Sequence, residues 1–303
     1  MVTLLLIATG DLIAHRAAGV ATGRELLELA GPPPERVVVE DFLAEPSWDT
    51  SVSTQLALAR RVRKALAEDE FTGVVVTHGV DTLEETAFLA DLMAGPARGG
   101  IVFTGALRPL HHAAPDGPAN LAASLAAAAD PALRGAGAVV CFGDELHAAR
   151  WATLTNAGFA STPHPLLGRV VDGRPRLTST PPFRPPHPGG EPEADVALLK
   201  TYPEMPASLL TMVTDLGAQG VVLEGTGEGN VPVELFGTIM GLIQMDIPVV
   251  VASRANTTEI GMAESMGAIS AAGLSAQKAR IALMAALSKG GGVAAAAGYF
   301  AGL

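Results

Sequence analysis

The sequence has little of what marks several common classes of protein. Cys141 is the only cysteine among 303 residues, so an intramolecular disulfide and a thiolate metal cluster are both excluded. Aromatic residues make up only 4% of the chain, which leaves few rings for stacking nucleic-acid bases. The 20 basic residues face 31 acidic ones, and the resulting net charge of −11 would repel a phosphate backbone. We therefore expect no nucleic-acid partner.

Long hydrophobic runs are missing as well. No apolar stretch approaches the roughly 18–20 residues that cross a bilayer. The first residues, MVTLLLIATG, lack the positive flank and the cleavage site of a signal peptide, and they predict a first strand. These absences predict a cytoplasmic protein with no membrane partner. The lone Cys141 stands in the apolar run AVVCFG, which predicts a small core residue.

What the sequence does contain is alternation of short apolar runs with longer helical patterns, and 49% of the residues are hydrophobic. Continuous apolar strands separated by helices indicate the α/β class, with mostly parallel sheets flanked by helices. The expected strands are Val2–Ala8, Arg36–Val39, Gly73–Thr77, Gly100–Thr104, Gly137–Phe142, Ala194–Leu199, Gly220–Leu223 and Ile247–Ala252. The expected helices are Thr54–Ala67, Leu83–Ala94, Asn120–Ala129, Ala207–Leu216, Pro232–Gln244 and Ser275–Ser288.

A Pro-rich segment, Pro175–Pro192, has few core residues and is typical of a linker. We therefore predict two domains, a larger one over 1–188 and a smaller one over 189–303. In open α/β sheets, ligands bind at the carboxyl ends of strands. Thr9-Gly10-Asp11 and Thr77–Asp81 follow two of the expected strands in the first domain, and Gly225–Asn230 follows one in the second.

The segment THGVDTLEET, which starts at Thr77, contains a capping box in Thr82–Glu85. This pattern predicts a helix that starts there, and it places Asp81 beside the helix N-terminus. A carboxylate at this position is stabilised by backbone N–H groups and the helix dipole. Asp81 is thus either a helix cap or part of a site.

Together with ATGDLIA near the start, this segment resembles the bacterial-type L-asparaginase/glutaminase family, whose signatures are TGGTIA and THGTDTMEET. The likeness continues in order through GALRP, DGPAN, GEGNVP and SAQKAR. The resemblance implies a two-domain α/β enzyme in which a threonine hydroxyl attacks a side-chain amide. A covalent acyl-enzyme forms, ammonia leaves, and water hydrolyses the ester. A hydroxyl nucleophile needs a base and oxyanion donors to act.

Carried over by position, the family's nucleophile is Thr9, and its aspartate, which holds the substrate's α-amino group, is Asp81. The family's second threonine is Val80, and its lysine is Leu154. Val80 keeps the shape of threonine and removes the hydroxyl, and Leu154 removes an ammonium. Loss of one partner would leave the other unpaired in a buried site, whereas loss of both leaves a consistent apolar patch.

The resemblance implies further binding residues. The family's Ser-Gln pair, which grips the substrate α-carboxylate, aligns with Ser47 and Trp48. Asn230 matches a family residue that reaches the substrate of a neighbouring subunit, so a homodimer or homotetramer is expected. Glu259 and Glu264 are candidates for the family's interface glutamate. The family's flexible-loop tyrosine has no counterpart, since no tyrosine precedes residue 202.

Asp11 stands where the family has glycine, two residues after Thr9. Its carboxylate is either a substitute general base or the cap of a turn. No histidine spacing is typical of a metal site, and we expect no cofactor. Three hypotheses follow: an amidohydrolase that uses Thr9, a repurposed enzyme that eliminates from, cyclises or transfers an aspartyl-type compound, and a non-catalytic homologue that binds an amino acid. The retained residues predict an amino-acid-like small molecule as substrate, with weak or altered hydrolysis.

Overall fold

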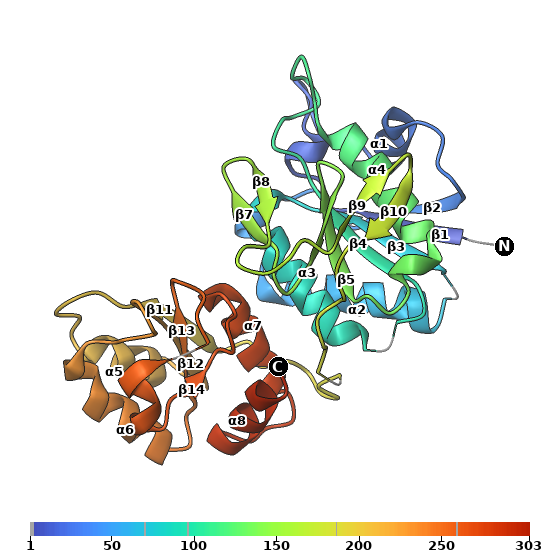
Figure 1. Cartoon of the computed structure of the whole chain (residues 1–303). Coiled ribbons are helices and arrows are strands. Elements are labelled where there is room, and N and C mark those ends of the chain that lie inside the picture. Colours follow the sequence, from blue (N-terminus) through green and yellow to red (C-terminus); the bar gives the residue numbers. More distant parts are fainter. Residues whose placement is uncertain (1–2, 70, 96, 186, 259) are drawn as a thin grey trace. The chain divides into compact units, whose positions relative to one another are not determined.

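The structure is a computed structural model that describes residues 3–303 except 70, 96, 186 and 259 (Figure 1). The chain divides into two compact units, residues 1–184 and residues 185–303. Each unit is built around a mostly parallel sheet flanked by helices, which confirms the predicted α/β class. No described helix is long and apolar enough to cross a membrane.

Among the described residues, the sheet of the first unit has eight strands in the order β10-β9-β6-β5-β4-β3-β1-β2. The strands β2, β1, β3, β4 and β5 are parallel, and β6, β9 and β10 extend the sheet with antiparallel pairing. Their bounds are β1 Thr3–Ala8, β2 Arg36–Asp41, β3 Gly73–Thr77, β4 Gly100–Thr104, β5 Ala138–Phe142, β6 Glu145–Ala148, β9 Gly168–Val171 and β10 Arg174–Leu177. A separate hairpin pairs β7 Thr153–Thr155 with β8 Gly158–Ala160.

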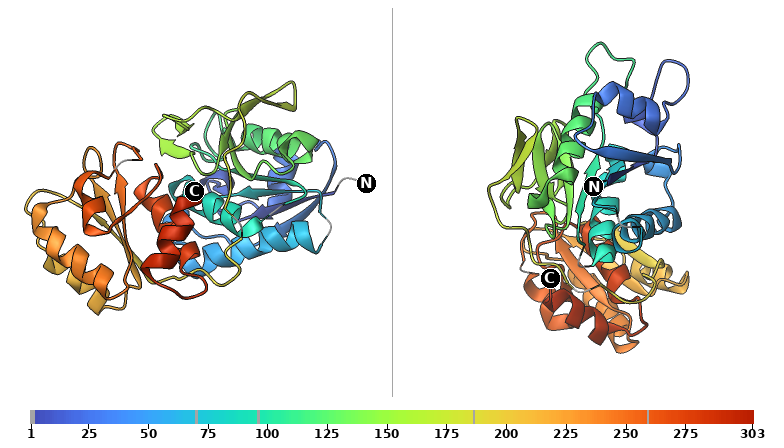
Figure 2. Two further views of the ribbon diagram at one scale, coloured as in Figure 1. Left: turned by 60° about the horizontal axis from the view of Figure 1, so that its bottom comes forward. Right: turned by 90° about the vertical axis from the view of Figure 1, so that its right-hand side faces the viewer.

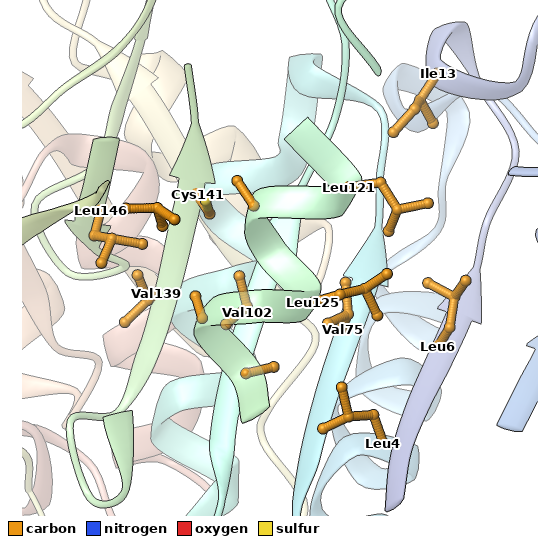
Figure 3. Packing of buried hydrophobic residues seen from close by; sticks show 14 of the residues in the cluster. Leu4, Leu6, Ile13, Val75, Val102, Leu121, Leu125, Val139, Cys141 and Leu146 are labelled. Carbon is orange, nitrogen blue, oxygen red and sulfur yellow. The ribbon is translucent and has the colours of Figure 1, made fainter. Parts of the chain in front are cut away.

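Helices cover both faces of this sheet. The left panel of Figure 2 shows α4 on one face and α2 on the other. The helices are α1 Gly23–Ala30, α2 Val52–Ala67, α3 Val80–Ala94 and α4 Gly117–Ala129. Strands β1, β3 and β4 are apolar along their length and almost fully buried, because both faces are covered. Figure 3 shows α4 packed over Leu4, Val75 and Val139, and it places the fully buried Cys141 in this core, as predicted.

The strand order reverses between β1 and β3. Strand β1 pairs with β2 on one side and β3 on the other, so the chain winds in opposite directions from this point. Doubly wound sheets bind ligands outside the carboxyl ends of the strands at such a switch point. The loops that start at Thr9 and at His78 leave the sheet here.

The second unit has a four-stranded parallel sheet in the order β11-β12-β13-β14 among its described residues. The elements are β11 Val196–Lys200, α5 Ser208–Asp215, β12 Gly220–Gly225, α6 Phe236–Gln244, β13 Val249–Ser253, β14 Ile269–Ser270, α7 Ala276–Ala286 and α8 Val293–Ala301. Helix α7 packs on β11, β12 and β13. The SAQKAR motif starts this helix, since Ser275 accepts a hydrogen bond from the Lys278 N–H at 3.5 Å, and Arg280 donates to the Val196 carbonyl at 2.7 Å.

Two expectations need correction. Helix α3 begins at Val80, whereas the predicted helix begins at Leu83 after a capping box at Thr82, and Thr82 interrupts α3 with φ −125° and ψ 15°. The hydroxyl of Thr82 donates to the Ser47 carbonyl at 2.9 Å, which ties the helix to the loop after β2. The Pro-rich segment is shorter than predicted, because its first residues pair in β10. Helices α1 and α8 and strands β6 to β10 and β14 were not predicted.

Candidate active site

Two of the sequence motifs hold the loops at the carboxyl edge of the first sheet. The buried Asn120 of DGPAN donates to the Gly105 carbonyl and accepts from the Gly143 N–H, both at 3.0 Å. Asp116 accepts from the N–H groups of Leu107 and Arg108 at 3.0 and 2.8 Å. One amide side chain thus joins the loops after β4 and β5, and one carboxylate folds the GALRP turn. These motifs therefore fix the loops at this edge of the sheet.

Thr9 lies at the end of β1 and is 3% exposed. Its hydroxyl donates to the Thr77 carbonyl at the end of β3, at 2.8 Å. The hydroxyl of Thr77 itself is fully buried and has no hydrogen-bond partner among the described residues. The ends of β1 and β3 therefore carry one oriented hydroxyl, that of Thr9, and one hydroxyl without a partner among the described residues, that of Thr77. A buried polar group without a partner is unfavourable, and such groups cluster at functional sites.

Asp11 follows Thr9 in a strained backbone conformation, with φ 63° and ψ −160°. This region belongs almost entirely to glycine and costs other residues about 1–3 kcal/mol. Its two carboxylate oxygens accept from the N–H groups of Leu12, at 2.5 Å, and Ser47, at 2.6 Å. Asp11 thus caps the short 3₁₀-helix Leu12–Ala14 and holds the loop after β2. The geometry matches the turn-capping role that was left open, and the role of general base stays a prediction.

Glycine residues allow this close approach. Gly10 has φ +80°, and a Cβ there would lie 2.8 Å from the Ala44 Cα. Gly79 has an ordinary backbone conformation, but a Cβ there would lie 1.8 Å from Asp11 Oδ2 and 2.3 Å from Ser47 Oγ. Ser47 is 2% exposed, and its hydroxyl has no partner among the described residues. The Asp11 carboxylate and the Ser47 hydroxyl therefore lie against the same bare Cα.

Val80 begins α3 and is buried, with its Cγ1 facing Gly105, where an added Cβ would lie 3.0 Å away. Leu154 is half-buried in β7, which packs against α3. Val80 and Leu154, which the resemblance aligns with the family's second threonine and its lysine, are therefore apolar side chains on neighbouring elements. Asp81 is exposed in the first turn of α3.

A pocket of about 270 Å³ opens at this edge of the sheet. It brings together four predicted site residues, Asp11, Trp48, Val80 and Asp81. The lining residues that sequence reasoning did not single out for the site are Leu12, His15, Val20, Ala44, Glu45 and Pro46. All of them follow β1 or β2, so their place after two strands was the signal that could have found them. Thr9 and Ser47 are buried and are not among the residues that line the pocket.

Asn230 lies in the second unit, where it is exposed at the edge of another pocket with Tyr202 and Pro232. Its backbone pairs with Thr226, which closes the GEGN turn after β12. Glu264 is exposed in the 3₁₀-helix Gly261–Met266, and Glu259 lies outside the described residues. The predicted contact with a neighbouring subunit stays a prediction.

His78 is buried directly after β3, beside Gly79. Its Nδ1 lies 2.8 Å from the Gly79 carbonyl, so this nitrogen is assigned as the donor. Burial lowers the pKa of His78 below its ordinary value of 6.5, while the hydrogen bond to Gly79 and the charge of Asp11 act in the opposite direction. Near pH 7 the ring is neutral, in agreement with a local structural role.

Known proteins match the chain along most of its length. Residues 3–183 match the family described as Asparaginase, N-terminal, and residues 195–300 match the Glutaminase/Asparaginase C-terminal domain. The chain is 29% identical to an L-asparaginase of Bacillus licheniformis over 267 residues, 84% of this chain and 83% of that one. It is 31% identical to L-asparaginase 2 of Escherichia coli over 265 residues, 80% and 73% of the two chains.

The fold agrees with these matches. The crystal structure of a probable cytoplasmic L-asparaginase from Campylobacter jejuni has a TM-score of 0.86 at 27% identity, over 99% of both chains. A doubly wound sheet with a hydroxyl, carboxylates and a pocket at its switch point defines an α/β enzyme. The two matches together cover most of the chain, and the protein belongs to the asparaginase family of amidohydrolases, as its motifs indicated.

Proposed function

We propose that this enzyme acts through Thr9 on the amide of a small molecule that resembles asparagine. The observation that carries the proposal is the position of the Thr9 hydroxyl at the switch point, two residues before Asp11, which lines a pocket together with Asp81. Asp81 is exposed and suits an ammonium group of the substrate. The names of the relatives, which are L-asparaginases, support an amide substrate.

We further propose that this site hydrolyses the amide slowly or in an altered way. The Thr9 hydroxyl donates to a backbone carbonyl, which cannot serve as a base at neutral pH, and the nearby positions Val80 and Leu154 are apolar. Loss of general acid–base help commonly lowers rates by about 10²–10⁴-fold. We expect ammonia release from asparagine at a corresponding fraction of the usual enzyme range of about 1–10³ per second.

Ammonia release from asparagine and glutamine by purified protein tests this. Thr9→Val removes the hydroxyl at nearly constant volume, and the exposed Thr180→Val serves as the matched control. We expect Thr9→Val to abolish the residual release of ammonia and Thr180→Val to leave it unchanged. Turnover by the wild type at ordinary enzyme rates would refute the proposal that hydrolysis is slow. Ammonia release that survives in Thr9→Val would refute the proposed role of Thr9 as the nucleophile.

A second experiment restores the missing pair. Val80→Thr combined with Leu154→Lys returns a hydroxyl and an ammonium to elements that pack together. We expect the double variant to gain at least about 10-fold in ammonia release, and each single variant to gain little, because each leaves one polar group unpaired. A double variant that folds and binds asparagine without any gain contradicts the proposed amide hydrolysis.

The alternative is a repurposed enzyme that eliminates from, cyclises or transfers an aspartyl-type compound, or a homologue that only binds an amino acid. The apolar residues Val80 and Leu154, which align with the family's threonine and lysine, support this alternative. Mass spectrometry of asparagine and aspartyl compounds after incubation distinguishes the two enzymatic cases. A change of mass without ammonia supports the repurposed enzyme, and calorimetric binding without any product supports the binder.

We also infer a cytoplasmic homodimer or homotetramer in which Asn230 completes the site of a neighbouring subunit. The exposed Asn230 side of the GEGN turn supports this. A mixture of Thr9→Val and Asn230→Ala subunits is expected to regain activity that neither variant has alone. Light scattering that shows a monomer would contradict the inference.

A further inference from the structure

The charges around the pocket are of one sign. Its lining includes the carboxylates of Asp11, Glu45 and Asp81 and the imidazole of His15. Among the described residues that line it, none is a lysine or an arginine. A pocket with this lining attracts a cation and repels an anion. The lining also includes the indole of Trp48, which is 69% exposed and offers an aromatic face to an ammonium group.

Two backbone donors beside the pocket that could hold an anion already bind Asp11, which itself lines the pocket. The N–H groups of Leu12 and Ser47 each bind one oxygen of the Asp11 carboxylate. The Ser47 hydroxyl, which has no partner among the described residues, lies on the same side of Gly79 as this carboxylate. These groups together form an anion cradle, consisting of Leu12 N–H, Ser47 N–H and Ser47 Oγ, and the chain fills it with its own side chain.

The filling side chain is fixed in place. Asp11 keeps a backbone conformation that suits glycine, and the two short hydrogen bonds from backbone N–H groups compensate for that strain. Gly79 leaves just enough room for the carboxylate against its Cα. A substrate carboxylate would therefore either displace Asp11 from the cradle or lie beside its negative charge. Two carboxylates a few ångströms apart near a surface weaken binding by about 10–1,000-fold.

We propose that the substrate is an amide that carries an ammonium group and no free carboxylate, because Asp11 occupies the position where a carboxylate would bind. The inference rests on the proposed function for the amide, and it adds the charge class of the substrate. Asparagine with its α-carboxyl group blocked as an amide has this character. So has 3-aminopropanamide, which is asparagine without the carboxylate.

Calorimetric binding of L-asparagine, L-asparaginamide and 3-aminopropanamide tests the inference. We expect the wild type to bind the two carboxylate-free probes about 10–100-fold more tightly than asparagine. Asp11→Gly suits the local φ and empties the cradle, so it is expected to remove or reverse this preference. Asp130→Asn, which removes one negative charge at a capping position outside the pocket, is expected to leave the preference unchanged.

Equal binding of all three probes by the wild type would overturn the inference, as would an Asp11→Gly protein with an unchanged preference. If Asp11→Gly does not fold, Asp11→Asn takes its place, because it keeps the side-chain shape and removes the charge. We expect this variant to reduce the difference in affinity between the carboxylate-free probes and asparagine. The measurements use binding alone, in a Thr9→Val background as well as in the wild type. If the wild type prefers the carboxylate-free probes but releases no ammonia, the proposed hydrolysis is rejected and the inference stands. If the wild type releases ammonia but shows no such preference, only the inference is rejected.

Discussion

Gly79→Ala is the sharpest test of how the site is held together. The Gly79 backbone, at φ −66° and ψ 139°, accepts any residue, so the effect of the substitution is purely one of space. The new Cβ would lie 1.8 Å from Asp11 Oδ2 and 2.3 Å from Ser47 Oγ, far inside van der Waals contact. Asp11 would have to leave its backbone N–H partners. Overpacking and the loss of these charge-assisted bonds together amount to about 2–4 kcal/mol of unfolding free energy.

Cys141 supplies a selective readout of this loss. It is the only cysteine, it is fully buried, and it lies in the first unit, so its labelling under increasing urea follows the unfolding of that unit alone. Asp11→Gly should remove most of the clash, so the double variant is expected to be less destabilised than the sum of the two single variants. A Gly79→Ala protein within about 0.5 kcal/mol of the wild type would refute the reasoning, and so would strictly additive effects.

Three further predictions concern the surroundings of the site. Asn120→Ala leaves the Gly105 carbonyl and the Gly143 N–H unpaired, so urea titration is expected to show a loss of about 2–4 kcal/mol. The exposed Asn156→Ala is its control, and a similar loss there would contradict the result. Since the folded pKa of His78 is lowered, stability is expected to fall as the pH drops below 6.5, where only the unfolded chain takes up the proton. The free energy of unfolding of His78→Asn should decrease less steeply between pH 7 and pH 5 than that of the wild type. Equal slopes for the two proteins would exclude His78 as the cause. Burial raises the pKa of Cys141 to about 12, so a thiol reagent at pH 8 should modify the urea-unfolded chain and leave the native protein unmodified over the same time.

The sequence predicted the buried part of the fold well, because parallel strands covered on both faces leave an unmistakable apolar run. Strands β3 and β4 begin and end at the predicted residues. Short edge strands lack that signal. Strand β10, Arg-Pro-Arg-Leu, alternates exposed and buried residues over four positions and contains a proline, which made the segment typical of a linker.

Helix boundaries show a different limit. Thr22–Glu25 forms a true capping box at the start of α1, yet the short helix that follows was not predicted. Thr82–Glu85 has the same pattern, but α3 begins before it, and the Thr82 hydroxyl bonds to the loop after β2. A local pattern cannot reveal such a tertiary competitor for the same hydroxyl.

For the site, the sequence predicted which loops carry the chemistry but not how their side chains pair. The motifs identified Thr9, Asp11 and Asp81 from their places after strands. That the Asp11 carboxylate binds the Ser47 N–H depends on the loop after β2 folding back across 36 residues, and no spacing rule predicts it. The bare Cα of Gly79, which makes room for this contact, likewise has a meaning only in three dimensions.

The two outer strands of the eight-stranded sheet restrict how copies of this protein can associate. An open edge of unpaired N–H and C=O groups invites another strand unless charges or proline block it. Strand β10 presents Arg174, Pro175 and Arg176 at one edge, and β2 ends in Glu40 and Asp41 at the other. Pro175 removes one N–H donor from the first edge, which also carries two arginines, and the second edge ends in two carboxylates. Subunits are therefore expected to meet through helices and loops, and not by extending the eight-stranded sheet across its outer strands.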